Sequence, residues 1–546
     1  MPALISVKLQ TSIADCLSLK LPLCRIGRLS IAYCPGVTSM LLFPAAITAE
    51  EKTVSQSPIK SPLVSILCPI LMSSLGLYGC AFQDEIPIAS GYAAKNICSD
   101  YFVSGLNPET IKIRLVAPQI KPFNKIWRVN LDEDKKNVTV SDIIFGNRYA
   151  HEAHYREGFG CTLLHGSTND ELNQQIPPLK TWSIPTDTQW PIGAGGTAPP
   201  VSGIDYGTLE RSVENAFEED RDLGINTLSV AVAYKDQLLM EKYAMSATAQ
   251  SRLIGWSMTK SFTSTLVGLL FDQGKLDPKK AAPVAEWKNT EKQNITLENL
   301  LHMAGGLQWS ETSKGSTPDQ GIMLFRQPDY AGYYLKKPVV AEPGVQFNYS
   351  TGATSLIARI VQHQLGGSIN HTYQFMQDSL FHKIAISSAV LEYDEAGQPS
   401  GGANLYMTTR DWTRLGLLYL RQGNWFGEQI LSKEWIQFAT SPSPANAQYG
   451  AQIWLNTEQK KWPALPADTY AFVGFEGQYV IIVPQHDLVV TRLGATFETD
   501  RFALEALISG VISSLPIPAT PTAPSAGSHP IIVSPVLDPE QQRTAL

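Results

Sequence analysis

Two pairs of strand-like segments, far apart in the sequence, constrain the fold more than any other feature. Residues 227–244 read TLSVAVAYKDQLLMEKYA, and residues 478–494 read QYVIIVPQHDLVVTRLG. Each contains two apolar runs around a short polar turn, which is the pattern of a β-hairpin. Between them, from about 290 to 440, helical periods and loops dominate. Strands from both ends of a domain around a mostly helical middle predict an α+β fold with an inserted helical subdomain.

Composition divides the rest of the chain into segments. Residues 181–204 are rich in Pro, Gly and Thr and lack apolar periodicity, so they indicate a linker. They separate an N-terminal extension at 85–180, to which the sequence assigns no role, from a long domain at 205–515. The Pro-rich residues 516–546 indicate a disordered tail.

The N-terminal 80 residues contain one apolar run, LVSILCPILMSSLGLYG at 63–79, which is followed by Cys80. Its last residues and Cys80 have the order and sizes of a bacterial lipoprotein cleavage box. The run is short for a membrane span of about 20 residues and long enough for the core of a signal peptide. We expect an exported protein, periplasmic or tethered to the membrane through a lipidated Cys80. A retained anchor and a buried core segment are the alternatives.

Three cysteines, Cys80, Cys98 and Cys161, lie at or after the expected cleavage. If Cys80 carries lipid, Cys98 and Cys161 make one possible disulfide in an oxidising compartment. The alternative is that both are small buried apolar side chains. The chain has no Cys-x-x-Cys, and His151 and His154 stand in HEAH instead of HExxH, so we expect neither a metal site nor a cofactor.

The charge balance disfavours nucleic acid as a partner. A net charge of −7 gives no general attraction to phosphates, and no convincing phosphate-binding glycine loop is present. A composition of 44% hydrophobic and 17% charged residues is that of a globular protein. We therefore expect no nucleic-acid partner.

The stretch GWSMTKSFTSTLVGLLFDQGK at 255–275 places Ser257 three residues before Lys260. The same spacing occurs at Ser57 and Lys60, but Pro58 keeps that pair out of a regular helix turn. Ser257 instead begins an apolar-striped helix, in which side chains three residues apart lie on one face. A serine needs a base to become a nucleophile, and a desolvated lysine can supply one. The alternative is that Ser257 caps the helix and Lys260 is solvated.

Five segments in sequence order carry a resemblance to a known family: GWSMTKSFTSTLVGLL, ITLENLLHMAGGLQW, EPGVQFNYSTGATSLIARIV, MTTRDWTRLGLLYLRQG and GFEGQYVIIVPQHDLVVTRLG. Together they resemble serine hydrolases related to class C β-lactamases and DD-peptidases. The closest branch includes the 6-aminohexanoate-dimer hydrolases and some carboxylesterases. The resemblance covers about residues 205–515. It implies the penicillin-recognising fold, with a central antiparallel sheet, a helical domain and an active site between them.

Carried over residue by residue, the resemblance implies that Ser257 is the nucleophile and Lys260 its base. Tyr349 would pass protons between the nucleophile and the leaving group. A phenol suits this relay, and we expect a nearby cationic lysine to lower its pKa. Gly477 would allow close backbone approach, and the N–H of Gln478 would bind the oxyanion together with that of Ser257.

The third motif departs from the family pattern. Relatives that hydrolyse β-lactams carry Lys-Thr-Gly or His-x-Gly there, whereas this chain has Phe475-Glu476-Gly477, and Thr351 replaces an asparagine of the second motif. The side-chain cation that would hold a β-lactam carboxylate is therefore missing, and Glu476 becomes a candidate substrate-binding residue.

These observations predict a metal-independent serine hydrolase that cleaves a small-molecule amide or ester through an acyl-enzyme. The first alternative is a DD-carboxypeptidase or β-lactamase acting on cell-wall peptides or penicillins. The second is an inactive binding protein on the same fold.

Overall fold

The structure is a computed structural model that describes residues 85–144, 146–180, 182–218, 224–312, 317–497 and 502–516. The expected lipoprotein segment, Cys80 and the tail from residue 517 therefore lie outside the described residues. Across the described part of the chain, no helix has the length and apolar character needed to cross a membrane.

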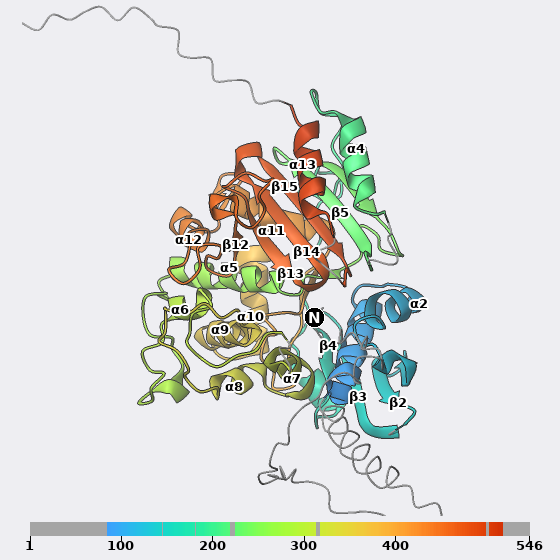
Figure 1. The fold of residues 1–546 in the computed structure, drawn as a ribbon, viewed down its shortest axis with the longest axis vertical. Coiled ribbons are helices and arrows are strands. Elements are labelled where there is room, and N and C mark those ends of the chain that lie inside the picture. The colour runs from blue at the N-terminus through green and yellow to red at the C-terminus, as the bar shows by residue number, and fades with distance from the viewer. Residues whose placement is uncertain are drawn as a thin grey trace, which may run out of the picture.

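A six-stranded antiparallel sheet forms the centre of the molecule, and it contains both predicted hairpins (Figure 1). Its order is β12-β13-β14-β15-β5-β6. The strands are β5 (Thr227–Tyr234), β6 (Gln237–Tyr243), β12 (Trp454–Leu455), β13 (Tyr470–Gly474), β14 (Gln478–Val483) and β15 (Leu488–Gly494). Because β15 pairs with β5, the two ends of the domain meet in the middle of the sheet.

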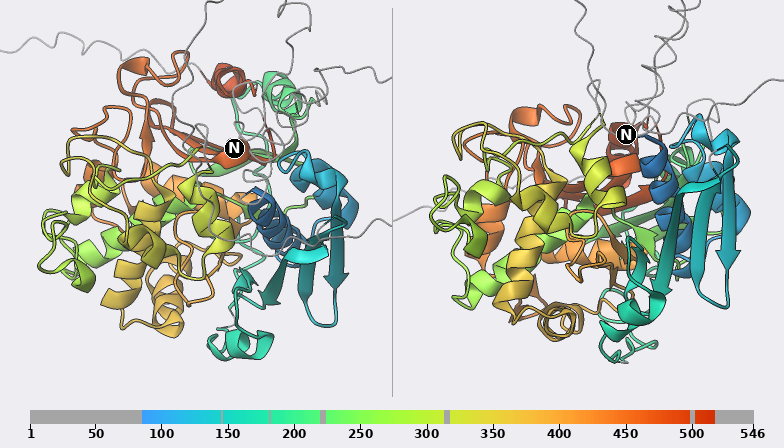
Figure 2. Two further views of the ribbon diagram at one scale, coloured as in Figure 1. Left: turned by 60° about the horizontal axis from the view of Figure 1, so that its bottom comes forward. Right: turned by 90° about the horizontal axis from the view of Figure 1, so that it is seen from below.

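Helices cover both faces of this sheet. Val230 and Val232 of β5 belong to the apolar cluster formed with α4 and α13, while Ala231 and Ala233 belong to the larger cluster on the opposite face. This alternation follows from the two-residue period of a strand. The covering helices are α4 (Tyr206–Asn215) and α13 (Leu504–Ser514) on one face, and α11 (Thr409–Leu420) on the other. The left-hand view of Figure 2 shows α4 and α13 together above the sheet.

The middle of the chain forms a group of helices beside the sheet (Figure 1). They are α6 (Leu297–Leu301), α7 (Asp319–Arg326), α8 (Tyr330–Leu335), α9 (Thr351–Gln364) and α10 (Ile369–Met376), with a π-helical turn at Gln377–Phe381. Helix α12 (Lys433–Ala439) follows α11. Helix α5 (Met258–Asp272) lies between this group and the sheet and packs against both.

Helix α5 is buried on every side. The sequence predicts one apolar stripe, yet every residue from Met258 to Leu270 is buried. Three of its hydroxyl side chains donate to backbone carbonyls: Thr263 to Gly401 at 2.7 Å, Ser261 to Gln452 at 2.8 Å and Thr265 to Ser261 at 3.0 Å. The helix therefore belongs to the interior and carries its polar residues to defined partners.

Residues 182–204 form an extended strap without regular helix or strand. The buried Arg414 of α11 donates hydrogen bonds to the carbonyls of Pro191 at 2.8 Å and Gly193 at 2.6 Å. The N–H of Ala198 donates to the carbonyl of Leu238 at 2.8 Å. The predicted linker is thus anchored to the domain that follows it.

The N-terminal extension combines a helix over 85–102 with a four-stranded antiparallel sheet at one side of the molecule (Figure 2, right). Its strands are β1 (Trp127–Asp132), β2 (Asn137–Asp142), β3 (Gly146–Arg156) and β4 (Gly160–Leu163), with short helices α2 (Pro108–Thr110) and α3 (Asn169–Gln174). A separate small sheet joins β7 (Leu253–Ile254), β9 (Leu405–Met407) and β8 (Val390–Leu391), and β10 (Asn424–Trp425) pairs with β11 (Glu428–Gln429).

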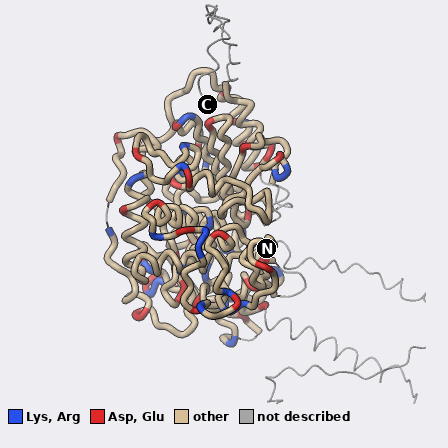
Figure 3. The backbone as a smooth tube through the Cα atoms, turned by 90° about the vertical axis from the view of Figure 1, so that its left-hand side faces the viewer, with Lys and Arg blue, Asp and Glu red and all other residues tan. Residues whose placement is uncertain are grey.

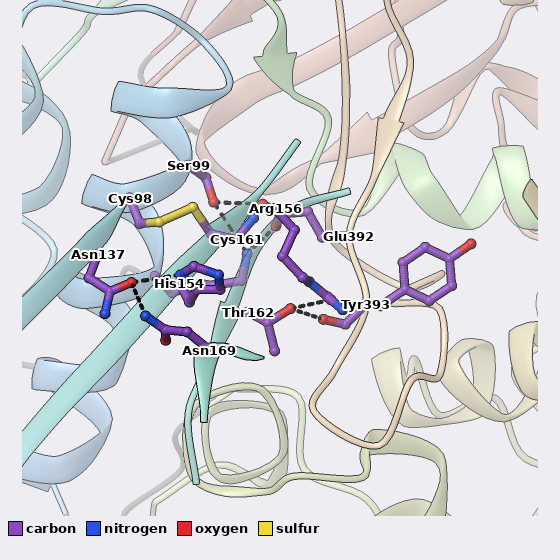
Figure 4. Close-up of a disulfide and its surroundings, with 11 residues drawn as sticks. Cys98, Ser99, Asn137, His154, Arg156, Cys161, Thr162, Asn169, Glu392 and Tyr393 are labelled. Carbon is purple, nitrogen blue, oxygen red and sulfur yellow. Dashed lines mark hydrogen bonds and ion pairs between the residues drawn. A yellow bond between two sulfur atoms is a disulfide. The ribbon is translucent and has the colours of Figure 1, made fainter. Parts of the chain in front are cut away.

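A disulfide between Cys98 and Cys161 joins the helix of the extension to its sheet (Figure 4). Beside it, the buried carboxylate of Glu392 forms an ion pair with Lys95 and accepts hydrogen bonds from Ser99 Oγ and the N–H of Cys161, both at 2.7 Å. Since Glu392 belongs to the later domain, these buried contacts dock the extension onto that domain.

Acidic and basic residues are interspersed along the backbone in the view of Figure 3. This mixture of both signs agrees with a net charge of −7 from 43 basic and 50 acidic residues.

Replacing both Cys98 and Cys161 by alanine should lower the free energy of unfolding by about 4 kcal/mol, because the bond joins residues 63 positions apart and restricts the unfolded chain. Urea titration of both proteins measures the difference. A reducing agent should destabilise the wild type and leave the double variant unchanged. Equal stability of the two proteins would contradict the prediction.

Candidate active site

Ser257 occupies the N-cap position of α5, with φ −64° and ψ −9°, and its side chain makes no capping hydrogen bond. The residue is partly exposed, whereas Lys260, one turn further along, is 1% exposed. Ser257 is therefore partly accessible, whereas the lysine one turn along is not. The alternative of a helix-capping serine beside a solvated lysine does not describe this geometry.

Lys260 lies buried beneath Ser257 and directs its three donors to three segments of the chain. Its Nζ donates to Ser257 Oγ at 2.8 Å, to Thr351 Oγ1 at 2.9 Å and to the carbonyl of Gly402 at 2.8 Å. Burial lowers the pKa of Lys260 to about 8, and the charge of Glu311 opposes this by raising it. A neutral amine is therefore accessible near neutral pH, and this is the form that can accept a hydroxyl proton.

The carboxylate of Glu311 lies on the far side of Thr351. It accepts hydrogen bonds from Trp309 Nε1 at 2.6 Å, from the N–H of Thr351 at 2.9 Å and from Thr351 Oγ1. Because Thr351 Oγ1 also accepts from Lys260, it links this carboxylate to the buried cation. Glu311 is not among the residues predicted from the sequence, and its one signal there is its place two residues after Trp309, where the matching segment ends.

Tyr349 lies beside both Ser257 and Lys260. The Nζ of Lys260 stands 4.9 Å from the centroid of its ring. Burial raises the pKa of Tyr349, Glu311 raises it further, and hydrogen bonding to Ser257 and Trp454 offsets only part of this. The expectation that the lysine lowers this pKa is wrong, because burial dominates and the ammonium faces the ring. The phenol therefore keeps its proton at neutral pH.

The third motif forms a tight turn at the start of β14. Gly477 has φ +79°, and a Cβ there would lie 2.7 Å from Nη1 of Arg492. The buried Arg492 donates to the carbonyls of Glu476 at 3.2 Å and Gly477 at 2.8 Å. The side chain of Gln478 accepts from the N–H of Gly494 at 2.9 Å. These bonds fix the peptide groups around Gln478, whose oxyanion-binding role stays a prediction.

The end of β13 lies directly against the backbone that leads into α5. A Cβ on Gly474 would meet the carbonyl oxygen of Gly255 at 2.2 Å, so only glycine allows this approach. Gly255 stands two residues before Ser257. The contact therefore brings the third motif next to the predicted nucleophile.

Glu476 has its carboxylate buried against the N-terminal extension, 5% exposed. It accepts a hydrogen bond from Trp256 Nε1 at 3.1 Å and another from the hydroxyl of Tyr92 at 3.0 Å. Trp256 and Glu476 have φ values of +46° and +64°, which are unfavourable for residues other than glycine. The Glu476 carboxylate thus links two residues with unfavourable backbone angles: Trp256, which precedes Ser257, and Glu476 itself, which precedes Gly477.

This placement gives Glu476 a supporting position and not the substrate contact that the sequence suggests. Burial raises the pKa of Glu476 to about 7, although the bonds from Trp256 and Tyr92 act in the opposite direction.

Among the described residues, no group of three or more His, Cys, Asp and Glu side chains is placed to hold a metal ion.

Labelling of Ser257 by a fluorophosphonate should slow as the pH falls through about 8, because protonated Lys260 cannot accept the serine proton. Substituting Glu311→Gln should move the midpoint to lower pH, since Glu311 raises the pKa of Lys260. The exposed Glu434 offers the control Glu434→Gln, which should leave the midpoint in place. A profile that Glu311→Gln leaves unchanged would argue against the coupling.

Substituting Glu476→Ala should slow the same labelling by about tenfold, or ~1.4 kcal/mol in the barrier, because Trp256 and Tyr92 lose their common acceptor. Glu476→Gln keeps the shape and one acceptor oxygen and should stay within about threefold of the wild type. Thermal unfolding of each variant checks that it is folded. Unchanged labelling of folded Glu476→Ala would show that the carboxylate does not support the site.

Comparison with known proteins identifies the family of this chain. A family model described as Beta-lactamase matches residues 213–509, just over half of the chain. A 6-aminohexanoate-dimer hydrolase from Paenarthrobacter ureafaciens is 23% identical over 375 residues, which cover 62% of this chain and 92% of that protein.

Two solved structures are similar at lower identity. One, from Bacillus anthracis and provisionally named a 6-aminohexanoate-dimer hydrolase, is 21% identical with a TM-score of 0.47 and covers 56% of this chain and 83% of its own. The other, a penicillin-binding protein homologue from Caulobacter crescentus, is 15% identical with a TM-score of 0.46 and covers 59% of this chain and 99% of its own.

The resemblance drawn from the five segments and the α+β fold class are thereby confirmed. The family match spans the six-stranded sheet, the inserted helices and Ser257, Lys260 and Tyr349. We conclude that this chain belongs to the beta-lactamase family, a family of hydrolases built on the serine β-lactamase fold.

Proposed function

We propose that the protein is a metal-independent serine hydrolase that cleaves an amide or ester bond through an acyl-enzyme intermediate. One observation carries the proposal: the Nζ of the buried Lys260 lies 2.8 Å from the Oγ of the partly exposed Ser257. Similarity to a 6-aminohexanoate-dimer hydrolase supports an amide or a related ester as the substrate.

In the proposed acylation, neutral Lys260 takes the hydroxyl proton of Ser257 while Oγ attacks the substrate carbonyl. The negative charge that develops on the carbonyl oxygen would be held by the N–H groups of Ser257 and Gln478. Preorganised donors of this kind need no rearrangement during the reaction. The hydrogen bonds from Arg492 around Gln478 support such a fixed arrangement.

Collapse of this intermediate breaks the bond to the leaving group, which needs a proton. In the proposed step Tyr349 gives its phenolic proton to the departing nitrogen or oxygen and regains one from the Lys260 ammonium. The raised pKa of Tyr349 supports a donor that is protonated before the step. Water then attacks the acyl group and regenerates Ser257.

A β-lactamase or DD-carboxypeptidase is the second candidate, and membership of the beta-lactamase family favours it. Phe475 and Glu476 stand where relatives that hydrolyse β-lactams place a cation or a hydroxyl, and the buried position of Glu476 offers no substitute. A fluorescent penicillin that labels the wild type and not Ser257→Ala would favour this candidate over the first.

Ser257→Ala should abolish hydrolysis of a panel of short-chain esters and amides, and Lys260→Met should lower kcat/KM by at least about a thousandfold, because both deprotonation and leaving-group protonation depend on Lys260. Ser513→Ala, an exposed serine on α13, is the matched control and should keep full activity. Turnover by Ser257→Ala would overturn the proposal. No turnover by the wild type would favour an inactive binding protein.

A further inference from the structure

Exposed apolar side chains gather at one place on the N-terminal extension. Ile113, Ile143 and Ile144 are 56%, 54% and 63% exposed. Ile113 and Trp127 line a surface groove of about 550 Å³. The N–H of Ile143 donates to the carbonyl of Ile126 at 2.8 Å, which places Ile143 next to the start of β1, where Trp127 lies. We call the surface formed by the three isoleucines and this groove the isoleucine surface.

Basic residues surround the isoleucine surface. From Glu109 to Arg128 the sequence has five Lys and Arg residues and one acidic residue, although the whole chain has a net charge of −7. Lys112 and Lys121 line the groove, as does the single acidic residue, Glu109. The side chains of Lys121, Lys125 and Arg128 are exposed. The surface is therefore apolar and positively charged at the same time.

This combination fits an anionic membrane surface better than a protein partner. Exposed apolar side chains that lie close together mark an interaction site. At a membrane, such side chains enter the boundary between headgroups and acyl chains, while Lys and Arg bind the lipid phosphates. Interfaces between proteins, by contrast, are depleted in lysine. Charge complementarity therefore favours phospholipid as the partner of the isoleucine surface.

The first described helix of the extension begins next to this surface. Glu85, at the start of the helix over 85–102, lines an apolar cavity together with Lys121, and Lys121 also lines the groove. Cys80, the expected lipidation site, stands five residues before Glu85 in the sequence. Five residues span at most about 18 Å. A membrane anchor at Cys80 would therefore keep this side of the extension close to the bilayer.

We propose that the isoleucine surface of the N-terminal extension lies on an anionic phospholipid membrane. The extension forms one side of the molecule, so a contact there sets the orientation of the whole protein on the bilayer (Figure 2, right). The contact adds this orientation to the expected tether, which by itself fixes only one end of the chain. It is also independent of the proposed hydrolase function.

A photoreactive side chain at Ile144 tests which molecules this surface touches. The full-length chain with Ile144→p-benzoylphenylalanine is reconstituted in vesicles of phosphatidylcholine with about 30% phosphatidylglycerol. Val345, which is 64% exposed and lies just before α9, is the matched control position. Irradiation should give at least about fivefold more lipid adduct at 144 than at 345, because apolar side chains of the docked surface enter the headgroup region.

Equal yields of lipid adduct at the two positions would overturn the proposal. Adducts from position 144 to a second copy of the chain in place of lipid would also overturn it, because they would indicate an interface between protein copies. Thermal unfolding of each variant checks that it is folded.

Charge reversal tests the basic part of the surface in the same vesicles. Lys121→Glu combined with Lys125→Glu should lower the lipid adduct at 144 at least about threefold, since each basic residue near an anionic surface strengthens binding. Lys275→Glu combined with Lys279→Glu makes the same charge change at exposed lysines of the later domain and should leave the yield unchanged. Vesicles of phosphatidylcholine alone should also lower it. A full yield after both the reversal and the change of lipid would contradict the proposal.

Discussion

The burial of the Lys260 ammonium is the constraint on which the rest of the structure depends. A cation inside a helix that is buried on all sides is costly unless its donors are satisfied. Ser257 Oγ, Thr351 Oγ1 and the carbonyl of Gly402 supply the three acceptors. They come from the start of α5, the start of α9 and the segment before β9, so these three segments have to meet at this point. The desolvation that makes the site costly is also what lowers the pKa of the lysine.

The side chain of Glu476, the central residue of the third motif, points the opposite way from the side chain at this position in the family pattern. A side chain at the position of Glu476 is expected to face the substrate, yet here it turns inward to Trp256 and Tyr92. The N-terminal extension thereby gains a direct contact with the turn that precedes Gln478, in addition to its docking through Glu392. The glutamate at position 476 thus has two consequences. It binds the N-terminal extension, and it leaves the third motif without the cation that would face the substrate.

Local patterns in the sequence predict much of this architecture, because strand and helix periods are local properties. The hairpins at 227–244 and 478–494 and the helix that starts after Ser257 follow from such periods. Contacts such as those of Glu311 with Thr351 leave no periodic signal, since 40 positions separate the two residues. The direction of the Tyr349 pKa shift also escaped prediction, because it depends on depth of burial and on which part of the ring the lysine faces.

Burial shifts the pKa values of Lys260 and Tyr349 in opposite directions, and this bears on which residue donates and which accepts a proton in the proposed reaction. Burial lowers the pKa of the lysine to about 8 and raises that of the tyrosine, so near neutral pH one is close to releasing its proton and the other holds it firmly. Two titratable groups whose pKa values are pushed apart in this way suit the roles of base and acid. Lys260 is then the group that activates Ser257, and Tyr349 gives up its proton only when a leaving group of higher basicity forms beside it. In the proposed reaction the proton of Tyr349 is therefore transferred only after Ser257 has attacked, from a phenol whose ring stacks against that of Trp454.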